Sequence, residues 1–322
     1  HLPEKPFLTV SIRSNKILNS VGIALLKGIS HLPFRVIYAL SDGLYVLIRY
    51  VFRYRQQVVR KNLRRSFPEK SEAEIRQIEK AFYHHLCDLM LEAIKGWSMD
   101  LKDYEKRITF RGLDKIGEHF DQGESVIVLA MHHNNWEWCS VVQHLAKHQL
   151  LMVYDPVRGN RQFEDFLISI REKFGGKAIP VNKAARTALQ FHLNKTPYAL
   201  WLAADQRPGE VNQLWTIFMN QEACFLPGPG KISVKTNQPV FFHHSRKLKR
   251  GHYEVEFSPL IERPAELSEQ EILQAYVQKM EEDIRHQPAH YLWSHKRWKQ
   301  QRPAGYKLFV PHSSSQTVTN QP

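Results

Sequence analysis

Short runs of uniformly apolar residues alternate with helical stretches through the middle of the chain, and this alternation limits the possible folds more than any other feature. The runs are SVIVLA (125–130), LLMVY (150–154) and YALWLA (198–203). Strands that are apolar on both faces are buried on both faces, which is typical of a parallel sheet covered by helices. The sequence therefore predicts an α/β fold with a mixed, centrally parallel sheet flanked by helices.

Further elements extend this predicted core in both directions. We expect helices at 72–97, 113–121, from about 135, at 161–174, 183–194 and 268–286, and shorter strands at 108–110, near Ala178, and at 215–219, 239–245 and 252–257. Ser71 and Glu74 have the spacing of a capping box at the start of the first of these helices. The last two strands are separated only by KLKRG, which predicts antiparallel pairing at the sheet edge.

Two apolar, aromatic stretches precede this core, at residues 17–29 and 33–52. A membrane-spanning helix needs about 20 mostly apolar residues, whereas the second stretch carries Arg35, Asp42 and Arg49. We therefore expect the segment to lie in the membrane interface and not to cross the bilayer. The alternative is a buried helical hairpin.

Basic residues outnumber acidic ones by 45 to 32, giving a formal charge of +13, so an anionic partner is expected. Nucleic acid, an anionic membrane surface, and an acidic protein or phosphorylated substrate all fit this charge. Seven cations and no acid lie between Arg49 and Arg65, directly after the apolar stretches, which favours lipid headgroups. A nucleic-acid partner is not expected, because the cations do not interleave with aromatic residues and no recognised nucleic-acid motif is present.

Three regions are expected: a helical membrane-associating region at 1–100, an α/β domain at 101–310 and a disordered tail at 311–322. The three cysteines are far apart and show no C-x-x-C spacing, which indicates neither a disulfide framework nor a thiolate zinc site.

Polar residues with catalytic potential follow the first apolar strand, in SVIVLAMHHNNWEW. Ligands of open α/β sheets bind at the carboxyl ends of strands. If Asn134 or Asn135 caps the next helix, Glu137 falls in its first turn, and we expect the loop to return its carboxylate to the imidazole of His132. A carboxylate on one ring nitrogen leaves the other free to accept a hydroxyl proton. His132 is thus a candidate general base, with backbone N–H groups at the helix start as candidate oxyanion donors.

Two other kinds of chemistry are not supported at this position. A serine nucleophile would require a G-x-S-x-G turn, which is missing. A zinc site built on His132, His133 and Glu137 does not match H-E-x-x-H spacing, and no third histidine is placed by the sequence, so no metal is expected. The remaining alternative is that these polar residues only cap a helix.

The segment HHNNWE fits His-x4-Glu and resembles the motif of the bacterial lysophospholipid and lipid A secondary acyltransferase family, whose usual form here is close to GHYGNWE. The resemblance covers roughly residues 20–300. Met131 and Asn134 stand where glycines are usual, and Pro227 stands where a threonine is usual. Further stretches resemble family blocks in the same order: RQQVVRKNLRRSFP, VYDPVRGNRQFEDF, LAADQRPG, LPGPGKIS and YLWSHKRWK.

The resemblance implies a glycerolipid-acyltransferase-like fold and an O-acyltransferase at the cytoplasmic face of a bacterial inner membrane. In that case His132 deprotonates an acceptor hydroxyl, Glu137 orients His132, and acyl transfer proceeds directly from a thioester. The donor would be acyl carrier protein or acyl-CoA, with no cofactor, and the acceptor a lipid A precursor or a lysophospholipid. We expect a monomer. The alternative is a non-catalytic, basic membrane scaffold with the same fold.

Four further residues are candidates for substrate binding by their positions in the matched blocks. Arg158 is suited to bind a phosphate of donor or acceptor, and Lys231 opens a helix after PGPG where a phosphate is favoured. Asp205 and Gln206 follow a strand and are expected to shape the pocket wall or hold the catalytic loop. The alternatives are an ordinary loop arginine at 158 and a purely structural role for Asp205.

Overall fold

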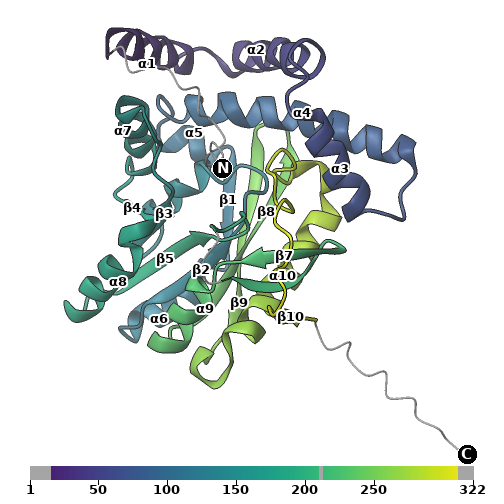
Figure 1. Ribbon diagram of the computed structural model, residues 1–322. Coiled ribbons are helices and arrows are strands. Elements are labelled where there is room, and N and C mark those ends of the chain that lie inside the picture. Colours follow the sequence, from purple (N-terminus) through teal and green to yellow (C-terminus); the bar gives the residue numbers. More distant parts are fainter. Residues whose placement is uncertain (1–15, 210–212, 311–322) are drawn as a thin grey trace, which may run out of the picture.

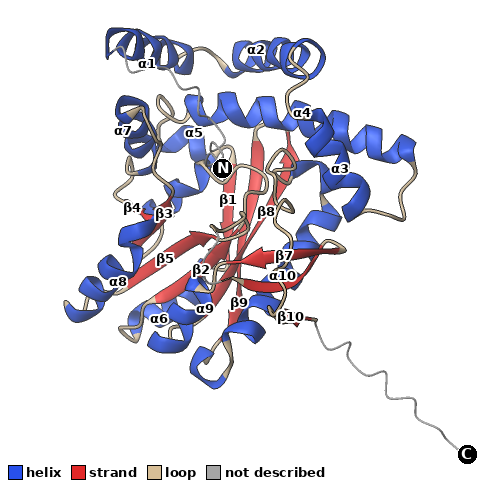
Figure 2. Ribbon diagram, viewed as in Figure 1, coloured by secondary structure: helices blue, strands red, loops and turns tan. Residues whose placement is uncertain are grey.

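The computed structural model describes residues 16–209 and 213–310, and its centre is a seven-stranded sheet in the order β1-β9-β8-β2-β5-β3-β4 (Figures 1 and 2). Strands β8, β2, β5, β3 and β4 pair in parallel, whereas β9 runs antiparallel to β8. The predicted mixed, centrally parallel sheet is confirmed. Its strands are β1 (Ile108–Arg111), β2 (Val126–Ala130), β3 (Gln149–Tyr154), β4 (Lys177–Pro180), β5 (Tyr198–Ala203), β8 (Val240–Lys249) and β9 (His252–Ile261).

Alternate side chains of the central strands enter two separate cores, which explains why these strands are apolar throughout. On β2, Ile127 and Leu129 belong to one core, whereas Val126 and Val128 belong to the other. This alternation follows from the two-residue repeat of a strand. A polar residue in such a strand would therefore be buried whichever way it faced.

Helices cover both faces of the sheet. They are α4 (Glu72–Lys95), α5 (Leu101–Glu105), α6 (Leu113–Asp121), α7 (Arg161–Arg171), α8 (Ala184–Leu193), α9 (Gly228–Thr236) and α10 (Glu269–His286). The capping box at the start of α4 is confirmed: the Glu74 backbone N–H donates to Ser71 Oγ, and the Ser71 backbone N–H donates to the Glu74 carboxylate. Local hydrogen bonds of this kind can be predicted because both partners lie in one turn of the chain.

Two strand predictions are confirmed: the strands at 239–245 and 252–257 pair antiparallel, and the strand at 215–219 is β6 (Leu214–Phe218), which forms a separate small sheet with β7 (Gln221–Phe225) and β10 (Leu308–Phe309). Two other predictions about individual elements are wrong. The strand at 252–257 is not at the sheet edge, because β1 pairs in parallel along its outer side. The helix expected from about 135 is a 3-10 helix, η2 (Trp138–His144).

The N-terminal residues that the structure describes form a helical layer over α4 (Figure 1). It consists of α1 (Lys16–Ser30), α2 (Phe34–Val46), a π-helical turn η1 (Leu47–Val51) and α3 (Gln56–Ser66). None of the helices in the described ranges is long and apolar enough to cross a bilayer. The boundary predicted at residue 100 stays a prediction, and the tail predicted at 311–322 lies outside the described residues.

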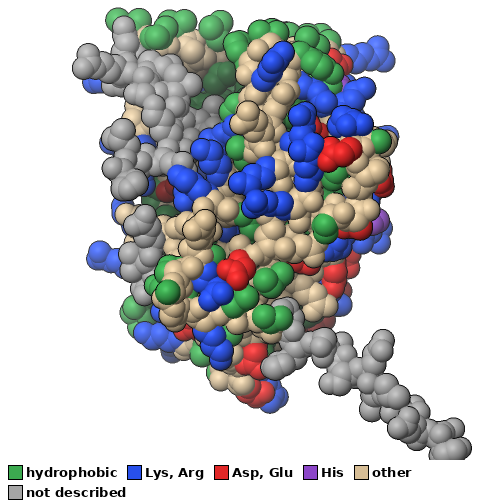
Figure 3. All heavy atoms as spheres, turned by 45° about the vertical axis from the view of Figure 1, so that its right-hand side comes forward, with side chains coloured by type: hydrophobic (Ala, Val, Ile, Leu, Met, Phe, Trp, Pro, Cys, Tyr) green, Lys and Arg blue, Asp and Glu red, His purple; other side chains and the backbone are tan. Residues whose placement is uncertain are grey.

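Many large apolar side chains of this layer are exposed. They are Ile17, Leu18, Val21, Leu25, Val36, Leu40, Val46, Leu47, Tyr50, Val51 and Phe52. Figure 3 shows apolar side chains along the upper rim of the molecule, above a face rich in Lys and Arg. The buried helical hairpin considered as an alternative does not describe α1 and α2, because each of them exposes one apolar face.

Candidate active site

His132 and Asp205 are brought together by the pairing of two neighbouring strands. In the parallel pair β2–β5, Ala130 is in register with Ala203, and each polar residue follows its strand by two positions. His132 Nδ1 lies 2.7 Å from Asp205 Oδ1, and the backbone N–H of His132 donates to the same oxygen over 3.2 Å. Parallel strands end at the same edge of a sheet, so the contact follows from the fold.

The electrostatics of this pair leave one ring nitrogen of His132 available. Burial alone would raise the pKa of the Asp205 carboxyl, but the charge and hydrogen bonds of His132 outweigh it and hold that pKa below its ordinary value. An ionised Asp205 accepts the Nδ1 proton, so Nε2 of the neutral ring carries a lone pair. Within the described ranges no residue hydrogen-bonds to Nε2, and 20% of the His132 side chain is exposed.

Glu137 does not hold the imidazole as expected. Arg171 on α7 donates to both oxygens of the Glu137 carboxylate, from Nε over 3.0 Å and from Nη2 over 2.6 Å. The Trp136 indole donates a further hydrogen bond to the same carboxylate. Burial would raise the pKa of Glu137, but Arg171 outweighs burial and lowers it. The prediction that the Glu137 carboxylate accepts a hydrogen bond from the His132 ring is therefore wrong, and Asp205 takes that place.

The active-site loop, residues 131–137, turns sharply through Asn134. This residue has a φ of 55°, in the left-handed region where glycine is favoured and asparagine is tolerated. Its side-chain amide donates to the Ser245 carbonyl over 2.6 Å, across to β8. Asparagine thus adopts here a backbone conformation that glycine favours. Neither asparagine is the expected helix cap, because the residue that precedes η2 is Glu137. Asn135 Oδ1 instead accepts the Trp138 backbone N–H over 3.1 Å and so closes the loop.

The segment from His290 to His295 lines the loop from the C-terminal part of the chain. The backbone N–H of Leu292 donates to the His132 carbonyl over 3.1 Å, and Asn134 donates to the His290 carbonyl over 3.1 Å. These bonds fix the backbone on both sides of the loop. The two segments are far apart in the sequence, so no local pattern signals this contact.

His295 was missed as a residue of the site. Its Nε2 accepts the backbone N–H of Arg207 over 3.1 Å, two residues after Asp205. Burial, reinforced by the charge of Arg297, lowers the pKa of His295 to about 3, so the ring stays neutral and accepts this bond. The only sequence signal was a histidine within the matched block YLWSHKRWK.

The other predicted substrate-binding residues differ in position and burial. Gln206 is half-buried directly after Asp205, so the loop after β5 contributes both. Arg158 is exposed in the loop between β3 and α7, and Lys231 is exposed on α9. Within the described ranges neither of these two side chains forms a hydrogen bond or ion pair, so their roles stay predictions. The structure also contains, among its described residues, no group of three or more His, Cys, Asp and Glu arranged to hold a metal.

Comparison with known proteins shows that the chain is similar to bacterial acyltransferases of lipid A biosynthesis. The sequence model described as bacterial lipid A biosynthesis acyltransferase matches residues 5–300. A lipid A biosynthesis acyltransferase of Haemophilus influenzae is 23% identical over 277 residues, 85% of each chain. The lipid A biosynthesis palmitoleoyltransferase of Escherichia coli is 23% identical, covering 85% of this chain and 88% of its own. The lauroyltransferase of the same organism is 23% identical over 93% of this chain and 96% of its own.

Proposed function

Because the chain belongs to the bacterial lipid A biosynthesis acyltransferase family and is an acyltransferase, we propose that it moves a fatty acyl chain from a thioester to a hydroxyl of a lipid A precursor. The relatives' names favour this acceptor over the lysophospholipid that the sequence resemblance also allowed. The observation that carries the proposal is the His132–Asp205 pair at the carboxyl ends of β2 and β5.

In the proposed reaction His132 is the general base. Its free Nε2 takes the proton of the acceptor hydroxyl while the hydroxyl oxygen bonds to the thioester carbonyl carbon. The carbon–sulfur bond then breaks, and the imidazolium returns the proton to the leaving sulfur. Asp205 stays ionised and stabilises the imidazolium, which places it in the orienting role first given to Glu137. A positioned base of this kind contributes about 10²–10⁴-fold to the rate.

Glu137 has a different proposed role, that of anchoring the active-site loop to α7. Its carboxylate is held at both oxygens by Arg171, and a bidentate pair of this kind fixes orientation as well as charge. We also propose that Gln206 contacts the substrate beside the pair, and that Arg158 and Lys231 meet phosphate groups of donor or acceptor.

The proposed location is the cytoplasmic face of a bacterial inner membrane. Among the described residues, more than half of the large apolar side chains that are exposed lie between Ile17 and Phe52. The seven cations from Arg49 to Arg65 adjoin this apolar layer, as suits an anionic headgroup region. Acyl carrier protein or acyl-CoA, both anionic, is the proposed donor, and the protein is proposed to act as a monomer without a cofactor or nucleic acid.

The proposal is tested with purified protein, an acyl-loaded donor and a lipid A precursor in vesicles, with product measured by mass spectrometry. H132A should lose at least 10²-fold in kcat, whereas H144A, which removes an exposed histidine from η2, should keep wild-type activity. Full activity of H132A would remove the catalytic claim. Vesicle binding without transfer from either donor would instead indicate a scaffold.

A further inference from the structure

We propose that Glu92 is a positioning residue for the reaction: it holds the active-site loop and joins that loop to α2, whose outer face is apolar. This inference rests on the proposed function, because it concerns the geometry of the same loop. Glu92 contacts neither His132 nor Asp205, so it acts through other residues. It lies on α4, beneath the loop, and is completely buried.

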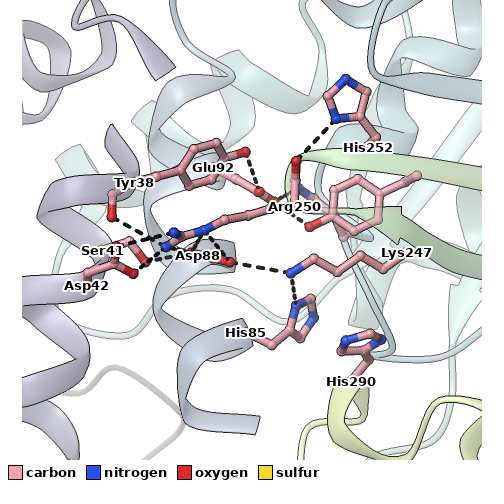
Figure 4. A network of polar contacts seen from close by, with 12 residues as sticks. Tyr38, Ser41, Asp42, His85, Asp88, Glu92, Lys247, Arg250, His252 and His290 are labelled. Atoms are coloured by element: carbon pink, nitrogen blue, oxygen red, sulfur yellow. Dashed lines mark hydrogen bonds and ion pairs between the residues drawn. The ribbon is translucent and has the colours of Figure 1, made fainter. Parts of the chain in front are cut away.

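Three side chains from three parts of the fold donate to the Glu92 carboxylate. Tyr38 on α2 donates to Oε1 over 2.9 Å. Asn135 in the active-site loop and Tyr253 on β9 both donate to Oε2, over 2.8 and 2.7 Å. Figure 4 shows Tyr38 turned toward Glu92, beside the ion pairs that hold the same helix. One carboxylate therefore fixes α2, the loop and the sheet relative to one another.

The carboxylate is held by neutral donors. Burial raises the pKa of Glu92, and the hydrogen bond from Tyr253 opposes this effect only in part. Within the described ranges no cation forms an ion pair with it. A buried carboxylate is tolerated when its oxygens are fully hydrogen-bonded, and the loss of one donor weakens the others. Because Tyr38, Asn135 and Tyr253 share this one carboxylate, a displacement of one donor weakens the hydrogen bonds of the other two.

At the loop end Glu92 makes two contacts. The Asn135 amide is bound on both sides, since its Nδ2 donates to Glu92 and its Oδ1 accepts the Trp138 backbone N–H. The Trp138 indole donates in turn to the backbone carbonyl of Glu92 over 2.8 Å. The loop leaving His132 is therefore fastened to α4 three residues after the proposed base.

At the other end Tyr38 is held in place by its surroundings. A Cβ atom at Gly251, which has a φ of +70°, would lie 1.9 Å from the Tyr38 hydroxyl, so the β8–β9 turn leaves room for this tyrosine only because glycine stands there. The guanidinium of Arg250 lies 4.6 Å from the centre of the Tyr38 ring.

A second set of hydrogen bonds and ion pairs holds α2 against α4. Ser41 donates to Asp88 over 2.7 Å, and Arg250 joins Asp88 to Asp42 over 2.6 and 2.7 Å (Figure 4). On the same helix Val36 and Leu40 are exposed. The helix proposed to meet the membrane is therefore two hydrogen bonds away from the active-site loop, through Tyr38, Glu92 and Asn135.

The test compares Y38F with the matched variant Y45F. Both remove one hydroxyl from α2, but that of Tyr45 bonds to Tyr50 in η1 and not to α4. We expect Y38F to lower kcat about tenfold, because small misplacements of a catalytic group are costly, with KM and vesicle binding unchanged. Amide hydrogen exchange of residues 131–138 should be faster in Y38F than in Y45F. E92Q should behave like Y38F, because its amide accepts at one oxygen only.

Two results separate this inference from the proposed function. Equal kcat and equal loop exchange in Y38F and Y45F would overturn the positioning role while leaving an inactive H132A as support for the base. An active H132A would overturn the base, and the exchange measurement would still decide whether Glu92 holds the loop. A merely structural Glu92 would lower thermal stability in E92Q without changing kcat per folded molecule.

Discussion

The imidazole of His132 hydrogen-bonds to the carboxylate of Asp205, a residue 73 positions away, over 2.7 Å. Glu137, only five positions away, is bound to Arg171 instead. The pairing of β2 with β5 therefore decides which carboxylate meets the ring.

D205N should lower kcat by about 10²-fold or more, because an amide cannot stabilise the imidazolium and no longer fixes the Nδ1 proton. The matched control is D283N, which removes the carboxylate from a second imidazole, that of His244, at 2.9 Å. Initial rates of acyl transfer measure both variants. Equal losses in the two would show that Asp205 acts only through stability.

Replacing Arg171 by alanine should destabilise the fold, because Glu137 would be left largely buried without its cation. Breaking such a pair costs about 3 kcal/mol in the free energy of unfolding, measured by urea denaturation. R263A, which breaks an exposed pair with Glu266, should change it little. The double variant R171M/E137Q should be more stable than R171A, and a double variant less stable than R171A would contradict the proposed anchoring.

The free energy of unfolding should begin to fall as the pH drops below about 6.5, before the carboxylates titrate. Burial lowers the pKa of His243 and of His290 to about 3. Between pH 6.5 and 3 these two imidazoles bind protons in the unfolded chain but not in the folded chain. Their contribution to stability is therefore complete above about pH 6.5 and decreases as the pH falls. Each such imidazole contributes a slope of about 1.4 kcal/mol per pH unit.

The variant H243F tests the origin of this slope. His243 packs between Trp201 and Phe257, so a phenylalanine ring suits the site without titrating. The slope of the unfolding free energy between pH 6 and 4 should be smaller in H243F than in the wild-type protein, by about 1.4 kcal/mol per pH unit. An unchanged slope in H243F would show that His243 is protonated in the folded protein.

Charged residues on the outer face of α1 should weaken membrane binding without affecting the fold. Leu25 is 63% exposed, and burying a leucine in lipid contributes about 1.5–3 kcal/mol. L25E should therefore reduce partition into anionic vesicles about tenfold or more, as measured by sedimentation. L193E, at a similarly exposed leucine on α8, is the control. Equal partition of L25E and L193E would argue against the proposed membrane face.

Much of the fold could be predicted because its signals are local. The run SVIVLA indicates a strand buried on both faces, and the boundaries of α6 at Leu113 and Asp121 match the predicted helix. The capping box at Ser71 and Glu74 is complete within one turn. Each of these patterns depends only on side chains that are neighbours along the chain.

The wrong predictions concern elements whose structure depends on contacts with distant segments of the chain. After Asn135 the sequence indicated an α-helix, yet the chain forms the 3-10 helix η2, which is bonded to α4 through the Trp138 indole. Likewise β1 pairs with the outer side of β9, a strand more than 140 residues later, although no local pattern joins the two segments. Local sequence patterns do not predict which distant segments pair in this way.

By itself the sequence determined that His132 follows the carboxyl end of a buried strand, within a motif that resembles that of an acyltransferase family. Both features depend only on residues that are close together in the sequence. Only the tertiary structure decided that Asp205 holds the ring and that Arg171 takes Glu137. It also decided that Glu92 joins the loop to α2. The physical reason is that a carboxylate bonds to the donor that folding brings nearest, and strand register and helix packing, not sequence distance, set which donor that is.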